Sequence, residues 1–163
     1  MKPRSQLPLL LAGAALAISQ AHLIYLLGTL RPNLFVLQLC FDSRHYWEIL
    51  EQWGADGLQR YLTHFAYDYV HLPIYASFGY LLATRGGALF VSGRGQEQLA
   101  IWLLPLAALF DLGENLAQAW LLAQEPGTPT PVVALSALCS AAKWGLIVLF
   151  VLIMALRILR RIR

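Results

Sequence analysis

Five polar side chains repeat at helical spacing between residues 61 and 75, inside otherwise apolar sequence. They are Tyr61, His64, Asp68, His71 and Tyr75. Steps of three, four, three and four residues place all five on one face of a helix. Carboxyl, imidazole and phenol groups that share a face can donate, accept and transfer protons. This face is therefore the first candidate site for acid/base chemistry.

Three further apolar stretches each carry a polar stripe. The stripes are Ser19, His22 and Thr29 in the first stretch, Asp111, Glu114, Asn115 and Gln118 in the third, and Ser136, Cys139, Ser140 and Lys143 in the last. One ionised side chain at the centre of a bilayer costs about 2.5–3.5 kcal/mol on the mildest insertion scale. Stripes of this kind are satisfied when they turn toward one another. We expect a single interior cluster, in the outer half of the membrane.

The charges of this cluster do not balance. The carboxyls of Asp68, Asp111 and Glu114 face one ammonium, that of Lys143, which leaves a net charge of about −2 with neutral histidines. We therefore expect a protonated carboxyl, a cationic histidine or a bound cation. Asp111 and Glu114, three residues apart on one helix, are the pair expected to supply an acid and a base side by side.

The predicted site follows from these residues. Its candidate catalytic residues are Asp111, Glu114 and Asp68, and its candidate ligand-binding or orienting residues are Tyr75, Asn115, Lys143, His71, His22, His64 and Gln118. The alternative is a structural network that joins the helices through the same groups. His64, Asp68 and His71 also suggest a zinc or iron site, but no HExxH or paired Glu-x-x-His motif is present. No metal is predicted, and no cofactor is indicated.

The elements that must position these residues are transmembrane helices. With 58% hydrophobic and 13% charged residues and a mean hydropathy of +0.57, the chain has too few polar side chains to coat a soluble globule. Four apolar runs, at residues 7–30, 61–83, 99–123 and 132–156, each reach the ~20 residues that cross a bilayer. The fold class predicted is an all-α, four-helix transmembrane bundle in one domain. Cleavage of the first run as a signal peptide is the less favoured alternative, because apolar sequence continues past Ser19-Gln20-Ala21.

Basic residues predict the orientation of the bundle. One side carries Lys2, Arg4, Arg85, Arg94, Arg157, Arg160, Arg161 and Arg163, and the other carries Arg31, Arg44 and Arg60 among acidic residues. The positive-inside rule then places both termini, including a basic tail at 157–163, in the cytoplasm of a bacterial inner membrane. Because the basic residues sit at the ends of apolar runs, a nucleic-acid partner is not predicted.

Residues 31–60 form the one sizeable polar segment, on the outer side. Phe41, Tyr46, Trp47, Leu50 and Trp53 alternate there with charges at helical spacing. This pattern favours an interfacial amphipathic helix with its aromatic rings at headgroup level. A lid over an outward-facing cavity is the alternative. We expect the glycines at positions 54 and 57 to end this helix, and Pro73 to kink the next one.

Two motifs of this chain resemble those of a known group. Asp68-x4-Pro73-x-Tyr75 and Phe110-Asp111-x2-Glu114-Asn115 are similar to the pattern of a family of small uncharacterised bacterial membrane proteins with four predicted helices. The resemblance covers about residues 37–122 and implies that Asp68, Tyr75, Asp111, Glu114 and Asn115 are shared polar positions. It implies no activity, and His64 and His71 depart from it. A looser likeness to emopamil-binding-type sterol isomerases concerns the general layout alone.

The functional hypothesis is a membrane cavity that binds a lipid-like or isoprenoid-like small molecule and performs acid/base chemistry on it. In this hypothesis Asp111 and Glu114 act as acid and base, Asp68 and Tyr75 orient the ligand, and Lys143 balances charge. The alternative is a non-catalytic subunit, an assembly factor or a small carrier linked to protons or cations. The lipid bilayer is a predicted partner, and the sequence indicates neither an oligomeric state nor a protein partner.

Overall fold

The computed structural model describes residues 6–86 and 94–162, and within these ranges it contains five α-helices and no strand. The helices are α1 (Leu7–Leu27), α2 (Leu34–Gln38), α3 (Ser43–Arg85), α4 (Arg94–Leu122) and α5 (Val132–Ile162). The predicted all-helical class is confirmed. Of the basic residues that predict the orientation, Lys2, Arg4 and Arg163 lie outside the described residues.

Three of these helices contain stretches long and apolar enough to cross a membrane. The stretches are Leu7–Leu27 in α1, Gln98–Leu122 in α4 and Val132–Arg160 in α5. The remaining predicted span, residues 61–83, is the second half of α3. Taken as a whole, α3 is the least apolar of the four long helices, because it carries charged side chains in its first part and the polar face from Tyr61 to Tyr75 in its second.

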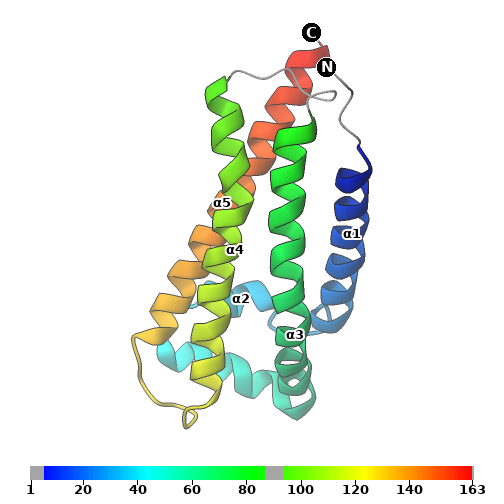
Figure 1. Ribbon diagram of the computed structural model, residues 1–163. Coiled ribbons are helices and arrows are strands. Elements are labelled where there is room, and N and C mark those ends of the chain that lie inside the picture. The colour runs from blue at the N-terminus through cyan, green and yellow to red at the C-terminus, as the bar shows by residue number, and fades with distance from the viewer. Residues whose placement is uncertain (1–5, 87–93, 163) are drawn as a thin grey trace.

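Local sequence signals explain where α3 starts and bends. Asp42 caps its first turn, since the carboxylate accepts a hydrogen bond of 2.8 Å from the backbone N–H of His45. Gly54 adopts φ 61° and ψ −172°, a conformation that side chains disfavour, and the chain changes direction there (Figure 1). The predicted end at Gly57 is wrong, because this glycine lies inside the helix. Helical structure also continues through Pro73.

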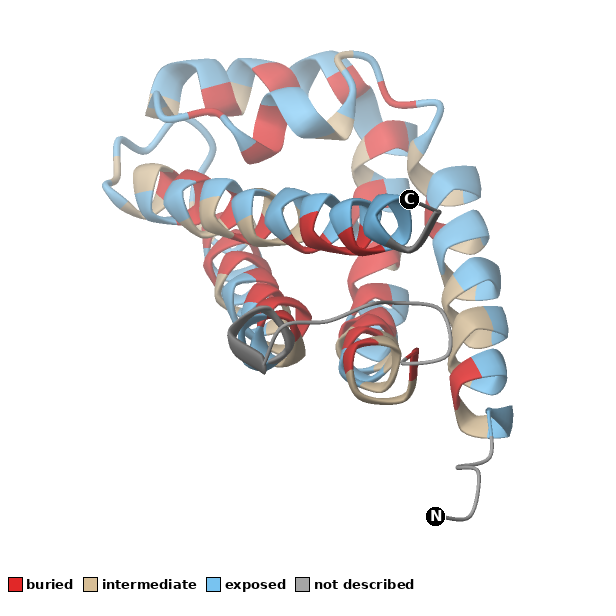
Figure 2. Cartoon of the chain, turned by 90° about the horizontal axis from the view of Figure 1, so that it is seen from above, coloured by how far each residue is buried: buried red, intermediate tan, exposed pale blue. Residues whose placement is uncertain are grey.

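The four long helices stand side by side, with α2 and the first part of α3 across one end of the bundle (Figure 1). α1 packs on α3, α3 on α4, and α4 on α5. Within the described chain, α1 and α5 do not pack extensively against each other. Seen from above, the buried positions lie on the faces that the helices turn toward one another (Figure 2). The bundle is thus a row of helices bent around an interior, with its open side between α1 and α5.

Apolar packing occurs in two clusters, one on each side of the polar residues. The cluster at the α2 end includes Leu37, Tyr46, Tyr61 and Leu121, and the other is built on small and large side chains of α3, α4 and α5. Three residues of the segment expected to lie at the membrane interface, Tyr46, Leu50 and Trp53, are buried in the protein. Their apolar face packs against the end of α4 and the start of α5, which removes it from water. Phe41 remains exposed.

The end of α5 also differs from the basic tail that the sequence predicts after the last apolar run. The predicted basic segment at 157–163 is helical as far as Ile162. Arg157 is 1% exposed and belongs to the interior of the bundle.

Candidate functional site

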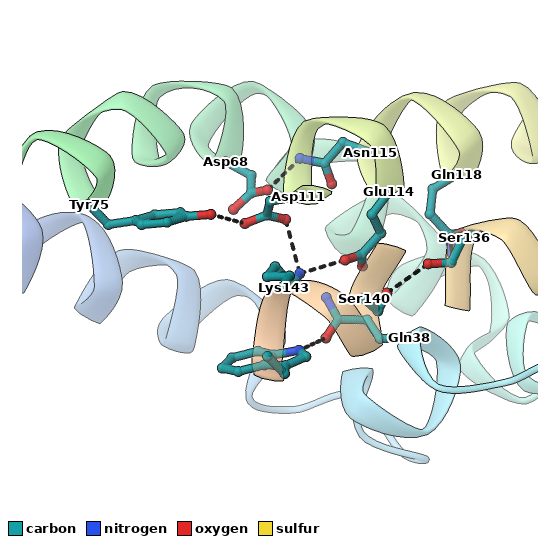
Figure 3. A network of polar contacts seen from close by, with 11 residues as sticks. Gln38, Asp68, Tyr75, Asp111, Glu114, Asn115, Gln118, Ser136, Ser140 and Lys143 are labelled. Atoms are coloured by element: carbon teal, nitrogen blue, oxygen red, sulfur yellow. Dashed lines mark hydrogen bonds and ion pairs between the residues drawn. The ribbon is translucent and has the colours of Figure 1, made fainter. Parts of the chain in front are cut away.

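The polar stripes of α3, α4 and α5 meet between the two apolar clusters and form a hydrogen-bonded network (Figure 3). Helical periodicity is responsible, because residues three and four apart project from the same side of each helix. The buried members are His64, Asp68, His71 and Tyr75 from α3, Asp111, Glu114, Asn115 and Gln118 from α4, and Ser136, Ser140 and Lys143 from α5. The network therefore ties three helices together at one level.

Lys143 is the centre of this network. Its Nζ lies 2.9 Å from a carboxylate oxygen of Asp111 and 2.5 Å from one of Glu114, and its side chain is 5% exposed. The second oxygen of Asp111 accepts a hydrogen bond of 3.1 Å from the Tyr75 hydroxyl. Two carboxylates of α4 therefore balance the charge of this ammonium, and the three groups have little contact with water.

Asp68 stands apart from this ion pair. Its Oδ2 accepts a hydrogen bond of 2.5 Å from the Asn115 amide. Among the described residues, its other oxygen accepts no hydrogen bond, and the carboxyl pairs with no cation. Figure 3 shows the two Asp68 oxygens pointing apart, one of them toward Asn115. Asp68 is thus the carboxyl of the cluster that has an oxygen able to accept a further hydrogen bond.

Gln118 belongs to a separate branch of the network, at the α2 end. It accepts a hydrogen bond of 2.7 Å from the Tyr46 hydroxyl and donates one of 2.8 Å to the Ser136 hydroxyl. Burial raises the pKa of Tyr46 above its ordinary value, which keeps this phenol protonated and able to donate. This branch links the first part of α3 to α4 and α5, and none of its three residues lines the main cavity of the described chain.

The three predicted histidines have different surroundings. The Nδ1 atom of His71 lies 2.8 Å from the hydroxyl of Ser19 on α1, and His64 bonds the backbone carbonyl of Tyr61 and stacks on its ring. His22 instead packs on the ring of Tyr67, with 4.2 Å between ring centroids. Tyr67 lies outside the polar face of α3, so His22 is not part of the cluster that the sequence predicts for it.

A cavity of about 470 Å³ lies beside the network, between α1, α3 and α5. Its walls are mainly apolar side chains of α1 and α5, and the polar face of α3 supplies one side. Ile24 and Val151 line it from α1 and α5 and are 61% and 57% exposed. The cavity therefore opens sideways between these two helices, where the bundle is not closed.

Helix α2 closes the cavity at the end away from the chain termini (Figure 1). Gln38 of α2 accepts a hydrogen bond of 3.2 Å from the indole of Trp144 on α5, and the rings of Phe35 and Trp144 lie 4.8 Å apart. These three residues line the cavity and are absent from the site that the sequence predicts. Only the folded chain brings α2 to α5, more than a hundred residues later, and helical spacing carries no signal of that contact.

Six of the predicted site residues line the cavity. They are His64, Asp68, His71, Tyr75, Asp111 and Lys143. Glu114, Asn115, Gln118 and His22 are not part of the lining. The predicted acid and base, Asp111 and Glu114, are thus both held by Lys143, but Asp111 alone of the two reaches the cavity.

The described residues do not assemble a metal site: no group of three or more His, Cys, Asp or Glu side chains among them can hold an ion. The His64, Asp68 and His71 arrangement considered from the sequence places these residues along one wall of the cavity. Their hydrogen bonds go to Tyr61, Asn115 and Ser19.

The chain was also compared with known proteins: no family model, no curated protein and no solved structure matches it.

Proposed function

We propose that this chain is a four-span protein of a bacterial inner membrane whose lateral cavity binds a lipid-like or isoprenoid-like small molecule. The fourth span is the second half of α3. That half lies between α1 and α4, both of which contain apolar candidate spans, and packs on each of them. Its polar face turns inward, whereas Leu62, Tyr69 and Val70 are exposed on its outer side. A helix flanked in this way crosses the bilayer together with its neighbours.

The orientation in this proposal has both termini in the cytoplasm and α2 on the outer side. It is supported by the excess of Lys and Arg near the ends of the chain. The start of α1 and the end of α5 lie at one end of the bundle, opposite α2 and the link between α4 and α5 (Figure 1). The cavity then belongs to the outer half of the membrane.

The observation that carries the proposal is the cavity itself, with apolar walls on α1 and α5, a polar side on α3 and a lateral opening. Its volume of about 470 Å³ lies within the range of small-molecule sites, roughly 300–1,000 Å³. An opening between two membrane-spanning helices faces lipid, so a hydrophobic molecule can enter from the bilayer. The polar groups on α3 then meet the head of that molecule, and α1 and α5 meet its chain.

Acid/base chemistry on the bound molecule is the catalytic form of this proposal. Asp68 and Asp111 carry it, because these are the two carboxyls that line the cavity. Tyr75 positions Asp111 through its hydrogen bond, and Lys143 balances the charge of Asp111. Glu114 is then a positioning residue that holds Lys143.

A second candidate function is favoured by the network residues that do not line the cavity. Glu114, Gln118 and Ser136 do not line the cavity and bond to other protein groups, as residues that only join helices do. In this version the chain is a non-catalytic subunit, an assembly factor or a small carrier linked to protons or cations. The unpaired oxygen of Asp68 beside an open cavity favours ligand binding over this alternative.

Native mass spectrometry of the protein released from its membrane tests the binding proposal. We expect copurifying hydrophobic molecules on the wild type and their loss in Val151→Phe, which fills the mouth of the cavity. Val148→Phe is the matched control, since Val148 lies on the same helix, is 55% exposed and does not line the cavity. Equal retention by both variants would contradict binding in this cavity.

A further inference from the structure

The charges around the cavity indicate which kind of head group it accepts. We propose that the bound molecule is a cationic amphiphile, whose ammonium group lies against Asp68 and whose hydrocarbon chain lies along α1 and α5. This inference rests on the proposed function and adds the chemical class of the ligand.

The first step concerns Lys143, the one lysine or arginine that lines the cavity among the described residues. Its ammonium already contacts two carboxylates, at 2.9 Å and 2.5 Å. An anionic head group would have to compete with Asp111 and Glu114 for this cation and would lie beside their negative charges. The geometry therefore disfavours an anionic ligand.

The second step concerns Asp68, which is 9% exposed and lines the cavity. Asn115 satisfies one of its oxygens, and within the described chain the other accepts no hydrogen bond and forms no ion pair. A carboxylate in this position is incompletely compensated in a site shielded from bulk water. A ligand cation supplies the missing charge.

All the titratable groups near Asp68 enter this balance. From α3 these are Tyr61, His64, His71 and Tyr75, from α4 Asp111 and Glu114, and from α5 Lys143. With Lys143 shared between two carboxylates, the groups sum to a net charge of about −2 while the histidines are neutral. A bound ammonium group brings this sum closer to zero, whereas a neutral alcohol leaves it unchanged.

The aromatic side chains of the cavity point to the same class of ligand. Tyr75, Phe78 and Phe150 line the cavity, as do Phe35 and Trp144 at its α2 end. Aromatic faces attract ammonium groups, including quaternary ones, and they also accept hydrocarbon chains. An ammonium head on an alkyl chain matches both the carboxylate and these walls.

Three probes with the same alkyl chain test this assignment: tetradecyltrimethylammonium, tetradecanol and myristate. Each radiolabelled probe is titrated onto the full chain in lipid nanodiscs, with binding to empty nanodiscs subtracted. The trimethylammonium head keeps its charge at every pH. Any pH dependence of its binding therefore comes from titratable groups of the protein. We expect the ammonium probe to bind about tenfold or more tighter than tetradecanol, with myristate weakest.

Variants then locate the head group. Asp68→Asn keeps the size of the side chain and removes its charge, and we expect it to weaken the ammonium probe about tenfold while tetradecanol binds as before. Asp56→Asn is the control, because Asp56 is exposed and does not line the cavity, and it should change neither probe. Unchanged tetradecanol binding also reports that Asp68→Asn is folded.

The outcomes separate the two proposals. Saturable binding of all three probes with equal affinity would overturn the cationic class and leave the lipid-binding cavity in place. Tighter binding of myristate would overturn it as well, by showing that Lys143 is available to an anion. If no probe binds the wild type saturably, both the cationic class and the proposed function fail.

Discussion

Removing the Lys143 ammonium should strongly destabilise the protein. In Lys143→Met the carboxyls of Asp111 and Glu114, now 2.9 Å and 2.5 Å from their partner, lose their counter-charge inside the bundle. Breaking a buried ion pair by removing one partner costs about 3–5 kcal/mol. The methionine fills most of the volume of the lysine stem, so the expected loss reflects charge and not a cavity.

A rescue variant separates the charge effect from packing. The combination of Lys143→Met with Asp111→Asn and Glu114→Gln removes all three charges, and we expect it to recover most of the lost stability, since neutral replacements of buried ionic groups are often tolerated. Glu48→Gln provides a matched surface control. The His45 and Glu48 side chains are 52% and 51% exposed, and breaking their pair should cost at most about 1 kcal/mol.

Unfolding in mixed micelles titrated with sodium dodecyl sulfate, followed by circular dichroism, measures these differences. A loss below about 1 kcal/mol for Lys143→Met would contradict a buried ion pair at this position, because a loss that small is typical of exposed pairs. It would mean that Asp111 and Glu114 are not both charged in the folded protein. Failure of the triple variant to recover stability would show that the lysine acts through packing.

Three further predictions concern packing, hydrogen bonding and topology. Gly79→Ala should destabilise the bundle by about 1–3 kcal/mol, because a Cβ there would lie 2.6 Å from the Leu104 side chain. Gly145→Ala should be tolerated, because a Cβ there would have nothing within 4 Å. Thermal unfolding in detergent compares the two variants. Gln118→Leu should cost about 1–3 kcal/mol in the same assay, since it leaves the buried Tyr46 phenol without its acceptor, and a variant as stable as the wild type would contradict a stabilising contribution of this hydrogen bond. Reporter fusions should be active in the cytoplasm at the C-terminus and outside in the link between α4 and α5, and the reverse pattern would overturn the outward-facing cavity.

The helices of this chain are predictable from the sequence because their signals are local. Apolar runs of bilayer length mark α1, α4 and α5, and Gly54 marks the bend of α3. The placement of residues 43–53 depends on contacts with distant parts of the chain, and no local sequence signal indicates it. Tyr46 and Trp53 look like an aromatic belt in the sequence, but the bundle offers them an apolar surface at the ends of α4 and α5, and they are buried there.

The candidate site is predictable to the level of helix faces. Spacing alone identifies the stripes that contain Asp68, Asp111 and Lys143, because each stripe has to turn inward. The periodicity does not show which member of a stripe reaches a cavity. Glu114 lies on the same face as Asp111 and also contacts Lys143, but it does not line the cavity, a difference set by how α4 and α5 approach each other.

Residues far apart in the sequence complete the site, and no local pattern reveals them. Helix α2 has five residues, too few for a periodicity signal, and its Gln38 meets Trp144 only in the folded protein. His22 shows the converse: its depth suits the cluster, but its rotation on α1 places it against Tyr67.

Quenching of Trp144 fluorescence by a brominated alkyl chain shows whether this cavity binds a lipid-like molecule. Brominated tetradecyltrimethylammonium and brominated tetradecanol are titrated onto the protein in nanodiscs while tryptophan fluorescence is recorded. We predict a saturable component that disappears in Trp144→Phe, whose side chain lines the cavity, and persists in Trp102→Phe, whose parent side chain is 61% exposed outside it. Quenching that rises without saturation, equally in the wild type and both variants, would show that the probes merely dissolve in the bilayer. This result would contradict binding in the cavity.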